Sequence, residues 1–174
     1  SDFTARLGVA SLATHIGFVP HDRNHSDYVA VRDMVRRVCD RCARNAQSFA
    51  LETGQEPAAT LKQFIADVDR SNLKINFDPA NMILYGTGDP IEALETVKSH
   101  VVSVHCKDGD WPAAPGTLGV EQPLGKGAVG MERFIAKLKQ IGYANALTIE
   151  REVHGDQQRR DIIAAVELLE KLRN

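Results

Sequence analysis

Short apolar runs rich in β-branched residues alternate along the whole chain with longer amphipathic stretches, a pattern typical of strand-helix units around a parallel sheet. Strands are predicted at residues 9–16, 47–51, 73–77, 101–104 and 146–149. Helices are predicted at 28–45, 57–69, 90–99, 131–141 and 157–172, and residues 1–7 at the end of a further helix that Gly8 stops. The pattern therefore predicts a single domain, residues 1–174, of about five βα units.

Five units do not close an eight-stranded barrel, so the predicted fold class is α/β, of the (β/α)8 TIM-barrel type but incomplete. The alternative is a complete, open, doubly wound sheet. The chain has no initiating Met, which fits a fragment or a processed product. An open half-barrel exposes two sheet edges and apolar helix faces, so we expect it to form a homo-oligomer or to need its missing part.

Composition narrows the class of protein. With 43% apolar and 25% charged residues, the chain resembles ordinary soluble globular proteins, and its net charge of -2 offers no basic field for nucleic acid. No apolar run is long enough to span a bilayer, and no signal-peptide pattern opens the chain, so we expect a cytoplasmic protein without membrane contact. Cys39 and Cys42 form a C-x-x-C without a second pair at zinc-finger spacing, and we expect both to be buried on a helix.

Polar side chains recur at the carboxyl ends of the predicted strands. They are His15, Glu52, Asp78, His105 and Glu150. Active sites of (β/α) barrels lie at this face, and three carboxylates there would repel one another unless a cation neutralised them. Oxygen ligands with one imidazole suit Mn²⁺ best, with Mg²⁺, Co²⁺ or Zn²⁺ as other options. In the alternative, each residue caps a neighbouring helix or pairs with an arginine such as Arg151.

Such a site suits proton transfer on a sugar. The metal would chelate a carbonyl and the adjacent hydroxyl and stabilise an enediolate. Glu52 and Glu150 come from strands three apart and can face each other across the bore, so we predict them as the catalytic base and acid.

At these residues the sequence resembles the xylose-isomerase-like barrel superfamily, in particular its sugar phosphate isomerase/epimerase branch. The matching segments are Thr14–Pro20, Leu51–Glu52, Asn76–Asn81, Val104–Asp108, Gly125–Gly127 and Ile149–Glu152. The resemblance implies that Glu52, Asp78, His105 and Glu150 bind the metal, and that Glu52 and Glu150 transfer the proton. It also implies that the chain corresponds to strands four to eight, with the first three units missing.

One position departs from the resemblance. Asn81 stands where the ketose 3-epimerases of the superfamily have a histidine, so recognition of the sugar hydroxyls is expected to differ. The absence of further strand-end histidines and of a basic patch argues against the related endonuclease branch, which needs several zinc ions.

Five residues are predicted to contact the substrate: His15, Asn81, Lys107, Asp108 and Trp111. For Lys107 and Asp108 the alternative is an ion pair at the barrel rim, and for Trp111 it is packing within its Gly/Pro-rich loop. Residues 125–130 match G-x-G-x-x-G only formally, although a substrate phosphate at the following helix is one hypothesis. Ser26 or Asp27 is expected to cap the helix at 28–45, and His25 to be solvated.

The sequence therefore predicts a divalent-metal-dependent isomerase or epimerase acting on a sugar, a sugar phosphate or a polyol. An inosose-type dehydratase would use the same metal site but expel water. A non-catalytic barrel fragment that acts as an assembly module is the alternative outside enzyme function.

Overall fold

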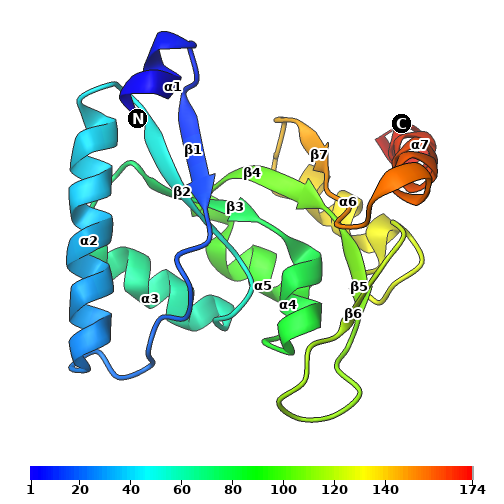
Figure 1. Ribbon diagram of the computed structural model, residues 1–174, viewed down its shortest axis with the longest axis horizontal. Coiled ribbons are helices and arrows are strands. Elements are labelled where there is room, and N and C mark those ends of the chain that lie inside the picture. The colour runs from blue at the N-terminus through cyan, green and yellow to red at the C-terminus, as the bar shows by residue number, and fades with distance from the viewer. Residues whose placement is uncertain (174) are drawn as a thin grey trace.

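The computed structural model describes residues 1–173, and its centre is a five-stranded parallel sheet (Figure 1). The strands are β1 (Ser11–Thr14), β2 (Ser48–Glu52), β3 (Leu73–Phe77), β4 (Val101–Cys106) and β7 (Leu147–Ile149). They pair in the order β1-β2-β3-β4-β7, so each lies beside the one before it in the chain. Because all pairs are parallel, the carboxyl ends of the five strands meet at one edge of the sheet.

Helices follow the strands in turn and pack side by side. They are α2 (Ser26–Ala43), α3 (Ala58–Val68), α5 (Pro90–Val97), α6 (Met131–Gln140) and α7 (Gly155–Arg173), preceded by the short α1 (Asp2–Arg6). Each of the five contacts the next, and Figure 1 shows α2, α3 and α5 along the same side of the curved sheet. In a doubly wound sheet, the order of the strands changes direction at a point inside the sheet. The sequential order is that of a TIM-barrel wall, so the predicted barrel-type fold is confirmed as a half-barrel of five parallel strands.

Two elements lie where the sequence analysis predicted neither a helix nor a strand. Helix α4 (Pro79–Tyr85) follows β3 directly, and β5 (Asp108–Asp110) pairs with β6 (Val120–Gln122) as an antiparallel hairpin. Both are too short to show a hydrophobic period, and the hairpin loop is rich in Gly and Pro.

The start of α2 corrects a further prediction. Its N-cap is His25, whose Nδ1 accepts the backbone N–H of Asp27 at 3.1 Å, in place of the predicted Ser26 or Asp27. His25 is therefore a capping residue rather than merely a solvated one.

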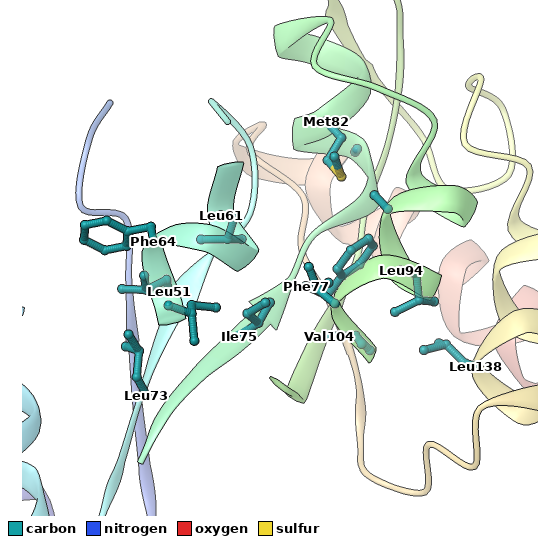
Figure 2. Packing of buried hydrophobic residues seen from close by; sticks show 14 of the residues in the cluster. Leu51, Leu61, Phe64, Leu73, Ile75, Phe77, Met82, Leu94, Val104 and Leu138 are labelled. Atoms are coloured by element: carbon teal, nitrogen blue, oxygen red, sulfur yellow. The ribbon is translucent and has the colours of Figure 1, made fainter. Parts of the chain in front are cut away.

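The core lies between the sheet and its helices. Figure 2 shows side chains of neighbouring strands, among them Leu51, Ile75 and Phe77, in a row with Phe64 of α3 and Leu94 of α5. All five are at most 1% exposed, and each contributes about 2 kcal/mol by leaving water. This packing fixes the strands, and with them the residues that follow their carboxyl ends.

The three cysteines are free and buried, as predicted for Cys39 and Cys42. Burial raises the pKa of Cys39 to about 11 and that of Cys106 to about 12, so these thiols stay protonated at neutral pH. Within residues 1–173, no helix has both the length and the apolar character that crossing a membrane requires.

Candidate metal centre

Four side chains from successive strand ends meet at the carboxyl edge of the sheet. Glu52 ends β2, Asp78 follows β3, His105 is in β4 and Glu150 follows β7. Each offers one ligand atom, and the four atoms lie within 4.8 Å of one another. The parallel sheet thus brings together the four residues that were predicted to bind a metal.

Nδ1 of His105 lies at the centre of the carboxylates. It is 3.1 Å from Oε1 of Glu52, 3.2 Å from Oε2 of Glu150 and 3.6 Å from Oδ2 of Asp78. An imidazole nitrogen carries at most one proton, so it cannot donate a hydrogen bond to all three carboxylates. The surplus of negative charge fits a cation in addition to, or in place of, that proton.

The two oxygens of Asp78 have different surroundings. Oδ1 accepts the backbone N–H groups of Ala80 and Asn81 at 2.8 and 3.0 Å and so caps α4. Oδ2 is buried and has no hydrogen-bond partner among residues 1–173. A buried carboxylate oxygen without a partner is costly, and a bound cation would remove that cost. Helix capping therefore accounts for one oxygen only, and a metal fits the other.

The charges of the cluster perturb one another strongly. Burial raises the pKa of Asp78, whereas the hydrogen bond with His105 lowers the pKa of Glu150 to about 2. Burial alone would lower the pKa of His105, but the surrounding carboxylates outweigh it and raise that pKa to about 11. Without a metal, the imidazole is therefore a cation held among carboxylates.

Glu52 and Glu150 each place a single oxygen in the cluster. Oε1 of Glu52 lies 3.3 Å from both Nε2 of His15 and Nδ2 of Asn81, in addition to its contact with His105. Oε2 of Glu150 is the oxygen that faces His105. Within residues 1–173, the second oxygen of each glutamate accepts no hydrogen bond from a protein group.

The sequence profile of the xylose isomerase-like TIM barrel matches residues 1–172. The chain belongs to this family. The family resemblance inferred from the strand-end motifs is thus confirmed.

Solved structures agree with this assignment. A xylose isomerase domain protein from Planctomyces limnophilus is 47% identical, with a TM-score of 0.95 over 99% of this chain and 62% of that one. A D-tagatose 3-epimerase-like protein has a TM-score of 0.76 at 20% identity, over 98% of this chain and 64% of that one. A xylose isomerase-like TIM barrel protein from Mycobacterium smegmatis, in complex with magnesium, has a TM-score of 0.70 at 20% identity. The match covers 98% of this chain and 63% of that one.

The last two likenesses show the fold alone. This xylose isomerase-like chain spans less than two thirds of the length of each of the three proteins.

Asp108 was predicted to contact the substrate or to form an ion pair at the barrel rim, and the structure shows a different role. Its carboxylate is buried and accepts the backbone N–H groups of Gly109, Gly125, Gly127 and Val129 at 2.9 to 3.1 Å. Four such bonds occupy the lone pairs of both oxygens. The structure therefore gives Asp108 the task of holding the 125–129 loop, in place of a contact with substrate or an ion pair.

The same bonds bear on the phosphate hypothesis for residues 125–130. Three amides of this Gly-rich loop already point at the Asp108 carboxylate, which takes the place that a phosphate would need. A Cβ at Gly127 would lie 2.5 Å from the Gly109 nitrogen, so the close wrap of the loop requires glycine there. The loop is an internal carboxylate cradle, so these three amides are already occupied, and a substrate phosphate at the N-terminus of the following helix α6 stays a prediction.

Trp111 lies at the start of the hairpin loop and is 45% exposed. It lines a surface groove of about 570 Å³ together with Tyr85 and residues 112–118. None of the four residues of the cluster lines this groove. A contact of Trp111 with sugar stays a prediction.

Several supporting residues were not predicted. Thr53 fixes Asp78, because its hydroxyl accepts the Asp78 N–H at 2.7 Å and donates to the Asp78 carbonyl at 2.8 Å. The side-chain amide of Asn76 lies 3.1 Å from Nε2 and 3.5 Å from Nδ1 of His105. Both are polar residues beside a ligand in or next to a buried strand, which is the signal that could have identified them.

Arg151 does not pair with any residue of the cluster. Its guanidinium binds Glu121 of β6 and Asp161 of α7, each at 2.8 Å. The arginine therefore ties the segment after β7 to the hairpin and to α7, and this fixes the backbone next to Glu150.

Proposed function

We propose that this chain carries the metal-binding and proton-transfer residues of a divalent-metal-dependent sugar isomerase or epimerase. The observation that carries the proposal is the arrangement of Glu52 and Glu150, each with one oxygen in the metal cluster and one oxygen free of hydrogen bonds from residues 1–173. The second oxygen of each carboxylate is therefore available to take up or give a proton. The family assignment and the sugar-epimerase names among its structural neighbours support the same class.

The cluster of Glu52, Asp78, His105 and Glu150 would hold the ion, with Mn²⁺ preferred and Mg²⁺, Co²⁺ or Zn²⁺ as other candidates. When bound, the ion would polarise the carbonyl of the sugar and stabilise the negative charge of the enediolate oxygens.

The chain's own carboxylates would move the proton. The free oxygen of Glu52 removes the hydrogen from the carbon beside the carbonyl, and that of Glu150 returns a proton from the opposite side. The two residues come from β2 and the end of β7, with β3 and β4 between them, which is consistent with attack from two sides. The side chains of Glu52 and Glu150 are 10% and 29% exposed, so a substrate can reach both carboxylates.

Substrate contacts are proposed for residues around the cluster. His15 and Asn81 both contact the Glu52 oxygen and present polar groups beside it, where sugar hydroxyls would bind. Trp111 would offer an aromatic face to the sugar ring. Because the Gly-rich loop is filled by Asp108, an unphosphorylated ketose or polyol is the preferred substrate class.

Solvent exchange tests this function. The Mn²⁺-loaded chain is incubated in D2O with a panel of ketoses and inososes, and deuterium at the carbon beside the carbonyl is followed by NMR. We expect exchange with at least one ketose, because proton abstraction is detectable even when epimerisation is incomplete. Mass analysis separates the alternatives, since epimerisation conserves mass and a dehydratase releases water.

Variants identify the residues responsible. Glu52→Gln and Glu150→Gln should each lower exchange at least about 100-fold, whereas the matched Glu132→Gln, on the exposed first turn of α6, should leave it unchanged. Metal uptake without any exchange across the panel would contradict the catalytic proposal and favour the assembly-module alternative.

A further inference from the structure

Lys107 is a buried lysine next to the metal cluster, with a side chain only 3% exposed. It directly follows β4, and its Nζ lies 3.3 Å from Oε2 of Glu150 and 2.9 Å from Oε2 of Glu152. Burying an ammonium group is costly unless carboxylates compensate it. The position of this ammonium is therefore set by the two glutamates.

Both the ammonium and the metal position share one oxygen of Glu150. Oε2 lies 3.2 Å from Nδ1 of His105 inside the cluster and also accepts from Lys107. A carboxylate oxygen can serve a cation with one lone pair and a hydrogen bond with the other. Rotation of Glu150 to offer both oxygens to the ion would move Oε2 and weaken its bond with the lysine.

We propose that Lys107 is a positioning residue that restricts Glu150 to one-oxygen binding of the metal and so keeps Oε1 available for proton transfer. This inference rests on the proposed function, because it assigns the lysine a task toward the proton-transfer pair. Of the two roles predicted from sequence, the ion pairs of Lys107 with Glu150 and Glu152 correspond to the second, and the proposed role differs from direct substrate binding.

The surroundings of Glu52 support the assignment. There the shared oxygen is held by His15 and the Asn81 amide instead of a lysine, and the other oxygen is again free. The two glutamates thus have the same one-oxygen arrangement, built from different partners. Glu152 is the outer anchor of the lysine, since its side chain is 64% exposed and outside the cluster.

The visible absorption of bound Co²⁺ tests the proposal without relying on turnover, because its intensity falls as the number of ligand atoms rises. Lys107→Met removes the ammonium and keeps an unbranched side chain, and Lys107→Arg keeps a positive donor. Lys137→Met is the matched control, since Lys137 forms an ion pair with Glu95 away from the site.

We expect Lys107→Met to lower the Co²⁺ absorption by about half, as Glu150 becomes a two-oxygen ligand. Its affinity for Co²⁺ should rise about threefold to tenfold, because Glu150 then offers two oxygens and the positive charge of the ammonium no longer repels the ion. If the chain catalyses exchange, kcat should fall about tenfold to 100-fold with KM changed less than threefold. Lys107→Arg should restore most of the spectrum, and Lys137→Met should match the parent chain.

Two results would overturn the role of Lys107. Unchanged Co²⁺ absorption and affinity in Lys107→Met would show that Glu150 keeps its geometry without the lysine. Weaker Co²⁺ binding in both Lys107→Met and Lys107→Arg would show that the lysine only maintains the structure of the site and does not restrict how Glu150 binds the metal. By contrast, absence of Co²⁺ binding by the parent chain would overturn the metal centre itself, so failure of the two proposals can be told apart.

Discussion

Each oxygen of the Asp78 carboxylate has a different task, and this division is the strongest residue-level sign of a metal. Oδ1 begins α4 through two backbone N–H groups, while Oδ2 is buried with no hydrogen-bond partner in residues 1–173. A cation bound at Oδ2 would compensate for its burial.

Asp78→Asn separates the two tasks. The amide oxygen can still cap α4, but the variant should bind Mn²⁺ at least about 100-fold more weakly, because it lacks the anionic ligand. Burial raises the pKa of Asp78 in the folded state, so its ionisation costs stability as the pH rises above the unfolded value of 3.8. The metal-free variant should therefore melt at the same or a higher temperature at neutral pH. Calorimetric titration and thermal unfolding measure the two effects, and unchanged Mn²⁺ affinity would contradict the metal centre.

His105 makes metal binding dependent on pH. Its pKa of about 11 in the metal-free cluster means that an ion must displace a proton at neutral pH. The apparent affinity for Mn²⁺ should rise about tenfold per pH unit between roughly pH 6 and 8, because fewer protons compete as the pH rises. Titration in buffers of different ionisation enthalpy should show release of about one proton per ion. A flat affinity over this range would mean that the imidazole is neutral before the ion binds.

At the scale of elements, the β5–β6 hairpin and the 125–129 loop form one unit around a buried carboxylate. Asp108 holds three amides of the loop, and Ala128 donates its N–H to the Gly109 carbonyl at 2.8 Å. The hairpin also supplies Glu121, which fixes Arg151 beside Glu150. The hairpin, which was not predicted from the sequence, thus supports Glu150, which was predicted as a site residue.

Asp108→Asn tests the importance of this unit. An amide would direct N–H groups at the N–H groups of the loop, so the free energy of unfolding should fall by about 3 kcal/mol. The matched Asp110→Asn, on the same strand but exposed, should change it by less than about 1 kcal/mol. Denaturant unfolding compares the two, and equal losses would argue against a special role for the buried carboxylate.

At the scale of the whole molecule, the half-barrel presents apolar surface at both ends of its sheet. In the described residues β1 and β7 each pair along one side only. Exposed apolar side chains lie near each of these edges, with Phe3, Leu7 and Val9 before β1 and Ile162, Ile163 and Val166 on α7. Unpaired edges and apolar patches favour association.

We therefore expect the 174-residue chain to self-associate, with an average mass in sedimentation velocity that rises with protein concentration. Ile163→Lys should shift the equilibrium toward the monomer by at least about tenfold, because it places a charge in the apolar patch of α7. Ala136→Lys, on the exposed face of α6, is the control and should leave the equilibrium unchanged. A monomer at every concentration would contradict this expectation.

The sequence by itself determined the strand-helix alternation and the four strand-end residues of the cluster, because hydrophobic period and polar interruptions are local signals. It could not distinguish Asp108 from Lys107, since the two are adjacent after β4 and only their partners differ. Those partners are the loop amides for one and Glu150 with Glu152 for the other. Only the tertiary structure brings residue 108 to residue 127 and residue 107 to residue 150, since contacts between distant segments follow from sheet order and packing rather than from spacing along the chain.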